Sequence, residues 1–371
     1  MEEPQAHGRL KTADVLKGIL ILGIVFVHMF MLNEVDNSGR SVSLILQPLY
    51  MALIGFFVVS GYFVPSGDSY TRIRKRSKLL IVLVVCSLVL PVAMYLWLWA
   101  LGQPSTVDDL LNSILASFAN QNVFSPLDSA NPIKVCYSAY VHYFLWVMFW
   151  SFLIFYPIVD RVLADRRLFA VTILLLLAAE AVLVFIDKML PFDAELIPIS
   201  VAFMLVGAAL SKEHFLERLE TAKLGSFGTW IPLMVSLPAL AVLIYLFPPG
   251  VKFNFAYFGE YGGLSAFPFF IEGIFVFVLF SYISMILARI PLLSDIFSIC
   301  GKYSLALAVL HIFVVRFILA MFYTMPTDTV FPPLSTLQIL TLGIFDVAFI
   351  IAVCTIIEKR KTVRKDRAET A

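Results

Sequence analysis

The sequence predicts an all-α integral membrane protein, a bundle of about ten transmembrane helices with both termini in the cytoplasm. Hydrophobic residues make up 60% of the 371 residues, charged residues make up only 14%, and the mean hydropathy is +0.91. Soluble domains carry nearer ~25% charged residues, so one water-soluble core could not bury this much apolar side chain. At roughly 20 residues per transmembrane helix, ten helices use about 200 residues. That leaves room for loops but not for a large soluble catalytic domain.

Ten apolar runs mark the predicted spans. They cover 13–32, 42–64, 79–101, 140–159, 168–187, 195–211, 228–248, 268–288, 302–323 and 336–357. The runs are nearly continuous and rich in Phe and Leu, whereas the strands of a membrane barrel would be shorter and alternating. The first run is long, lacks a small-residue cleavage pattern and precedes nine further spans, so it is predicted to stay as a helix and not to act as a signal peptide. The predicted organisation is a cytoplasmic segment at 1–12, a ten-helix domain at 13–357 and a basic cytoplasmic tail at 358–371.

Basic residues predict the orientation, because short cytoplasmic connections retain Lys and Arg. The two ends and alternate connections carry 21 of the 27 basic residues, and the opposite connections carry four. This asymmetry favours an even number of spans with both termini in the cytoplasm. We call the side with the 21 residues the inner side and the opposite side the outer side. The longest outer connection, at about 102–139, either shapes an extracytoplasmic entrance or merely joins two spans.

Charge and cysteine content exclude other classes of protein. The net charge of +1 argues against a nucleic-acid partner, because binding to a phosphate backbone needs a concentrated cationic surface. Four cysteines are too few and too dispersed for a disulfide scaffold. No metal ion is expected.

Ionisable side chains within the spans are costly and are therefore candidates for function. Lys17 and His28 are 11 residues apart, almost three helical turns, so they share one helix face at a separation of about 16 Å along the axis. Lys17 lies near the inner end and His28 in the outer half. Each has a simpler explanation: Lys17 can extend to the lipid headgroups, and His28 can be a buried histidine bonded to a neighbouring helix. Arg316 and Asp346 lie at similar depths on consecutive spans, which predicts a buried ion pair.

Four segments, in chain order, resemble the acyltransferase-3 family of integral membrane enzymes, which acylate bacterial surface glycans and other extracytoplasmic acceptors. In the first span the resemblance is an Asp, then a basic residue followed by Gly, with a His after ten intervening residues. The other segments lie in the second span, at the start of the fourth span and near the C-terminus. The matching residues are Asp14, Lys17, Gly18 and His28; Phe56, Phe57, Ser60 and Gly61; His142; and Gly301, Lys302, Ser304 and His311. The family's paired arginines before the third span are matched only by charge, by Arg72 with Lys75 or Lys75 with Lys78.

The resemblance implies a membrane O-acyltransferase that moves an acyl group, acetyl first among the candidates, from cytoplasmic acyl-coenzyme A to a hydroxyl of an extracytoplasmic or lipid-linked glycan. Histidine is the side chain whose pKa lies nearest neutrality, so His28 would be the base, or alternatively a nucleophile that carries the acyl group. Coenzyme phosphates need cations at the inner mouth. The candidates for that task are Lys17, Arg72, Arg74, Lys75 and Arg76. Asp14, Ser60, His142, Glu272 and His311 are candidates for supporting the site or for receiving the acceptor.

Simpler or different explanations remain for several of these features. A basic run is expected in any inner loop that faces anionic lipid. The whole chain could also be a proton-coupled transporter or exporter of a polysaccharide or small solute, or a sensory or accessory module with a degenerate site. Under the first interpretation the protein is a multi-pass protein of a bacterial plasma membrane, its partners are the glycan acceptor and membrane lipids, and assembly into a homo-oligomer is allowed.

Overall fold

A computed structural model describes residues 10–31, 48–49, 51–103, 106–118, 143–186, 190–246, 266–322 and 334–370. Helices account for nearly all of this part of the chain, and it contains no strand. The predicted all-α class is therefore confirmed.

A helix occupies each of the ten predicted apolar runs. Among the described residues, nine helices are long and apolar enough to cross a membrane, and the helix of the second run is apolar but shorter. These helices are α1 (Lys11–Met31), α3 (Ala52–Tyr62), α5 (Lys78–Ala100), α7 (Tyr143–Ala164), α8 (Arg166–Ile186), α9 (Ile197–Lys212), α11 (Phe227–Leu246), α12 (Ala266–Leu287), α14 (Ser304–Phe322) and α15 (Thr336–Thr370). α15 continues without a break through most of the predicted basic tail.

Shorter helices lie between the spans. They are α4 (Ser69–Arg76), α6 (Val107–Phe118), the 3-10 helix η1 (Pro191–Leu196), α10 (Phe215–Thr221) and α13 (Pro291–Lys302). α6 makes part of the long outer connection helical. It begins with a capping box, in which the Thr106 hydroxyl accepts from the Asp109 N–H at 3.1 Å and the Asp109 carboxylate accepts from the Thr106 N–H at 2.9 Å. The remainder of that connection, 119–139, lies outside the described residues.

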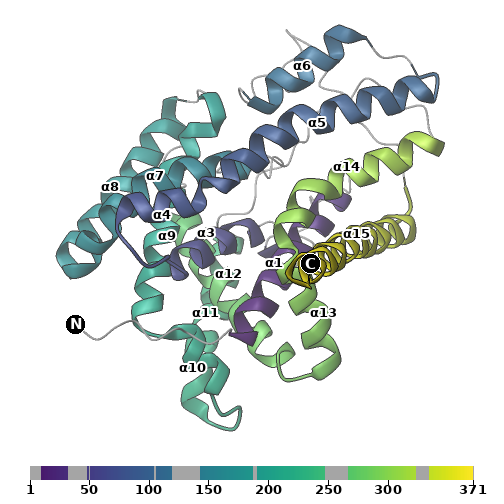
Figure 1. Cartoon of the computed structure of the whole chain (residues 1–371). Helices are drawn as coiled ribbons and strands as arrows, with labels where there is room; N and C mark the ends of the chain where they lie inside the picture. Colours follow the sequence, from purple (N-terminus) through teal and green to yellow (C-terminus); the bar gives the residue numbers. More distant parts are fainter. Residues whose placement is uncertain are drawn as a thin grey trace.

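α1 is the central helix of the bundle. In its most apolar stretch of 18 residues, 72% of the residues are buried in the protein. The corresponding shares are 11% for α8 and 17% for α11, which present their side chains outward. α1 contacts α3, α12, α13, α14 and α15, and Figure 1 shows it running through the middle of the molecule. A residue on α1 is therefore placed to work with side chains from several other helices.

Two glycines allow α13 to lie directly against α1. A Cβ atom at Gly18 would overlap the backbone carbonyl of Phe297, and a Cβ atom at Gly301 would overlap the carbonyl oxygen of Asp14. Small residues permit such close approach of helices in membranes. Both glycines belong to segments that carry the family resemblance, and their contact fixes the turn from which α14 begins.

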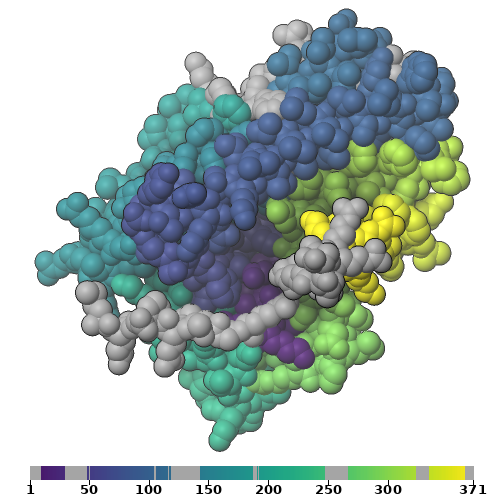
Figure 2. Space-filling view, in the orientation of Figure 1, coloured from purple at the N-terminus to yellow at the C-terminus, as the bar shows by residue number. Residues whose placement is uncertain are grey.

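A cleft opens between α5 and α14. The two helices meet near their outer ends, where Trp97 stacks on Phe317 with ring centroids 4.1 Å apart and Gln103 donates a hydrogen bond to the Ala320 carbonyl at 2.8 Å. α5 also contacts α7, whereas α14 contacts α1, α13 and α15. Figure 2 shows a hollow between the blue surface of α4 and α5 and the green and yellow surface of α14 and α15, with purple atoms of α1 inside it. We call this hollow the α5–α14 cleft.

Candidate functional site

Two predicted site residues, His28 and His311, bond to each other across the α1–α14 interface. His28 Nδ1 lies 2.9 Å from His311 Nε2, and the two rings stack with centroids 5.1 Å apart and an interplanar angle of 22°. His311 Nδ1 lies 2.7 Å from the carbonyl oxygen of Leu307. His311 is fully buried and His28 is partly exposed. The histidine bond to a neighbouring helix, the simpler explanation for His28, is thus present, and its partner is itself a candidate for the site.

Local packing explains why these two rings meet. α14 begins at Ser304, directly after the turn that Gly301 holds against α1, and His311 lies about two helical turns further along. Val25, about one turn before His28, and Met29, directly after it, belong to one apolar cluster with Val315 and Leu319 of α14. The two helices are therefore held together both before and after the histidine pair.

Lys17 and Arg76 both contact Phe63, the residue directly after α3. Lys17 Nζ lies 4.9 Å from the centroid of the Phe63 ring and 3.8 Å from the Asp14 carboxylate one turn earlier on α1. Arg76 Nη2 donates to the Phe63 carbonyl at 3.3 Å. Because α1 is continuous from Lys11 to Met31, Lys17 and His28 do share one helix face, as the spacing predicted. Two of the five predicted coenzyme-binding cations thus contact the same residue, Phe63, on the inner side of the histidine pair.

The basic side chains of α4 have different surroundings. Arg76 Nε donates to the Tyr156 hydroxyl at 3.1 Å, and Arg72 forms a 2.7 Å ion pair with Asp160, so both turn toward α7. Lys75 donates to the Ser66 carbonyl at 2.8 Å, and Arg74 is exposed. Arg76 is therefore the member of the run that reaches Lys17 through a shared neighbour.

A capping aspartate begins α4. The Asp68 carboxylate accepts from the Thr71 N–H at 3.0 Å. The hydrogen bonds from Thr71 hold the pKa of Asp68 below its ordinary value. Asp68 therefore stays ionised near neutral pH and keeps the first turn of the helix that carries the basic run in place.

A family model described as an acyltransferase domain matches residues 10–357, nearly the whole chain. The chain belongs to the acyltransferase-3 family. No curated protein and no solved structure matches it. With its long apolar helices, this member of the acyltransferase-3 family is a multi-pass membrane acyltransferase.

The other candidate residues of this acyltransferase are Ser60, Glu272 and His142. Ser60 faces α7, where its hydroxyl lies 3.7 Å from the Met148 sulfur. Glu272 is buried on α12, which packs against α1. His142 lies outside the described residues. Among the described residues, no group of three or more His, Cys, Asp or Glu side chains is placed to hold a metal ion.

The predicted ion pair between Arg316 and Asp346 is wrong. Both residues are buried, but neither carboxylate oxygen of Asp346 has a hydrogen-bond partner within the described part of the chain. One turn before Asp346, Gly343 lies against Phe26 and Met29 of α1. This face of α15 therefore turns toward α1, and equal depth in the membrane does not bring the two charges together.

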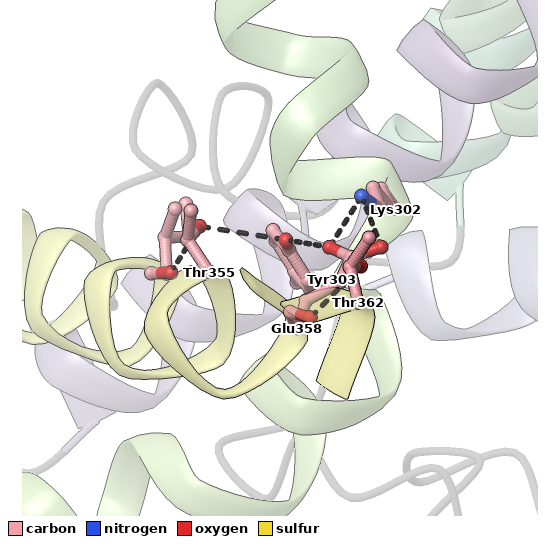
Figure 3. A network of polar contacts seen from close by, with 6 residues as sticks. Lys302, Tyr303, Thr355, Glu358 and Thr362 are labelled. Atoms are coloured by element: carbon pink, nitrogen blue, oxygen red, sulfur yellow. Dashed lines mark hydrogen bonds and ion pairs between the residues drawn. The ribbon is translucent and has the colours of Figure 1, made fainter. Parts of the chain in front are cut away.

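A polar network fastens the inner half of α15 to the start of α14. Figure 3 shows Lys302 and Tyr303 reaching the same carboxylate of Glu358; Lys302 Nζ and the Tyr303 hydroxyl each lie 2.6 Å from Glu358 Oε2. The hydrogen bonds to Glu358 raise the pKa of Lys302 above its ordinary value. The network ties α15 to the turn that positions the helix bearing His311.

Sequence reasoning did not identify three groups that orient the candidate site. Phe63 contacts both Lys17 and Arg76, Tyr156 anchors Arg76, and the Leu307 carbonyl contacts His311. The first two are aromatic residues in apolar runs, where no residue pattern distinguishes them from core side chains. Leu307 precedes His311 by four residues, one helical turn, but its carbonyl becomes a partner only through the direction in which the imidazole points.

Proposed function

We propose that the protein transfers an acyl group, acetyl in the first instance, from cytoplasmic acyl-coenzyme A to a hydroxyl of an extracytoplasmic or lipid-linked glycan at a bacterial plasma membrane. Family membership supports acyl transfer, and the resemblance of the four segments supports the donor and the glycan acceptor. The observation that carries the proposal is the arrangement along α1. His28 bonds to His311, and Lys17 and Arg76 both contact Phe63 on the inner side of that pair.

The inner cations suit the donor. The diphosphate and phosphate groups of coenzyme A bind best to side chains that offer charge-assisted hydrogen bonds, which both Lys17 and Arg76 can supply. The 11 residues from Lys17 to His28 correspond to about 16 Å along the helix axis. The extended pantetheine arm of the coenzyme would run along this face of α1, within the α5–α14 cleft, and bring the thioester to His28.

The imidazole of His28 suits the chemistry. A sugar hydroxyl is a weak nucleophile, so it needs a base that removes its proton as the oxygen attacks the thioester carbonyl carbon. The new C–O bond forms, the C–S bond breaks, and the departing coenzyme thiolate takes the proton back from His28. No net proton is consumed, and the histidine is ready for another cycle.

Purified protein incubated with labelled acetyl-coenzyme A tests the proposed function. We expect saturable binding of the donor, slow hydrolysis without an acceptor, and transfer of the label to a sugar fraction when membrane-derived glycan lipids are added. Protein that neither binds, hydrolyses nor transfers would contradict the proposal and favour a transporter.

The donor site makes a separate prediction. Lys17→Met and Arg76→Met each remove one cation from the neighbourhood of Phe63 and are expected to raise the KM for acetyl-coenzyme A roughly tenfold, the loss of one charge-assisted hydrogen bond. Steady-state kinetics at saturating acceptor measure the change. Lys223→Met, which removes an exposed cation from another inner loop, is the matched control and should leave KM unaltered. An equal change in KM in all three variants would contradict a specific donor site and show that only the total positive charge on the inner side matters.

A further inference from the structure

The hydrogen-bond partners of the two histidines determine where their protons lie. The carbonyl oxygen of Leu307 can only accept, so the contact at 2.7 Å requires a proton on His311 Nδ1. A neutral imidazole carries one ring proton, which leaves His311 Nε2 as an acceptor. The 2.9 Å contact between the rings then requires a proton on His28 Nδ1. His28 Nε2 is consequently the nitrogen with a free lone pair.

We propose that His311 is a positioning residue that holds His28 in the tautomer whose Nε2 accepts the acceptor's proton. The inference rests on the proposed function, in which His28 is the base. His311 is 0% exposed and His28 is partly exposed, so only His28 is placed to touch a substrate. His311 acts through the orientation and protonation of the ring beside it, as the orienter in a nucleophile–base–orienter arrangement does.

The hydrogen bonds that join His28, His311 and the Leu307 carbonyl also stabilise the positive charge that forms on His28 during the reaction. When His28 Nε2 takes the hydroxyl proton, the ring becomes an imidazolium whose Nδ1–H still donates to His311 Nε2. The Leu307 carbonyl continues to accept from His311 Nδ1–H, so both rings keep their orientation. The proton on His28 Nε2 then passes to the coenzyme thiolate as the C–S bond breaks. Without His311, the Nδ1–H of a positively charged His28 would lose the acceptor that the structure provides.

Nitrogen-15 NMR of the detergent-solubilised protein with labelled histidine tests the assignment without any reaction. We expect both His28 and His311 to carry the proton on Nδ1 and to have an unprotonated Nε2, with His28→Gln and His311→Gln used to assign the signals. A proton on Nε2 of either neutral ring would overturn the inference. This measurement does not depend on the identity of the substrates, so it stands even if acyl transfer to a glycan is not observed.

Replacing His311 by two side chains of similar length, Gln and Met, distinguishes a positioning role from a packing role. The amide oxygen of His311→Gln can accept from His28 Nδ1–H near the place of the lost Nε2, whereas His311→Met fills similar space without a comparable acceptor. We expect kcat to fall roughly 10²-fold or more in the Met variant and to recover at least tenfold in the Gln variant. The KM for the donor should stay within about twofold in both, because the site at Phe63 is untouched.

The outcomes are distinct. Equal kcat values for the Gln and Met variants would show that His311 serves packing alone and would overturn the inference. His214→Gln, at an exposed residue before α10, is the matched control and should keep wild-type kinetics. If both His311 variants fail to fold, the tautomer measured in the wild-type protein decides the question. If wild-type protein folds but transfers no acyl group, the proposed function fails and the tautomer assignment is judged separately.

Discussion

Alanine at position 28 is expected to lower the rate of acyl transfer by roughly 10²–10⁴-fold, the usual contribution of a general base. His28 is the partly exposed member of the histidine pair, and no other imidazole among the described residues contacts His311. Binding of acetyl-coenzyme A should persist, because the cations near Phe63 belong to other side chains. Single-turnover transfer of labelled acetyl groups and equilibrium binding of the donor measure the two properties separately.

His214→Ala, at an exposed histidine of the same chain, provides the comparison. Its rate should match that of the wild-type protein, and all three proteins should elute identically in size-exclusion chromatography. Full activity in the His28→Ala variant would contradict the assignment of the base. Loss of donor binding together with loss of transfer would indicate instead that His28 supports the structure of the cleft.

Gly301→Ala is expected to destabilise the protein by about 1–3 kcal/mol and to lower activity at the same time. The added methyl group would overlap the carbonyl oxygen of Asp14, which belongs to a rigid helix and cannot rotate away. α13 would have to move from α1, and the turn that begins α14 would move with it. Thermal unfolding in detergent, monitored as the loss of the monodisperse peak in size-exclusion chromatography, measures the change in stability.

Gly225→Ala is the matched substitution, since a Cβ atom there would meet no other atom within 4 Å. We expect its melting temperature and activity to equal those of the wild type. Equal melting temperatures for Gly301→Ala and Gly225→Ala would show that α13 does not rely on backbone contact with α1. A destabilised Gly301→Ala that kept full activity would show that the start of α14 tolerates displacement.

The membrane-spanning helices could be predicted from the sequence because a sufficiently long run of hydrophobic residues by itself identifies a span. Each apolar run is long enough to cross the membrane or nearly so, and no soluble alternative can bury such segments. α13 escaped prediction because its 12 residues are too short and too mixed in polarity for a span. The capping residues Thr106 and Asp109 do signal the start of α6, but a short helix of this kind is easily passed over within a long connection.

The candidate site could be predicted only in part, for a geometric reason. Lys17 and His28 lie on one helix, so their relation follows from the helical repeat. His311 entered through resemblance, and its distance from His28 depends on how α14 packs against α1. The wrong prediction of an ion pair between Arg316 and Asp346 has the same origin. The depth of a residue follows from its position in a span, but the direction in which its side chain points relative to other helices depends on how the helices pack.

The close contact of α1 with α13 and α14 has a consequence for biosynthesis. His28 and His311 are separated by 283 positions along the chain, so the partner of the first helix is among the last segments to leave the ribosome. At about 5–20 residues per second, α1 waits on the order of tens of seconds in the membrane before His311 is made. Chains that terminate early can insert most of their spans yet never assemble the histidine pair. Only a chain translated beyond His311 can therefore acquire the paired site.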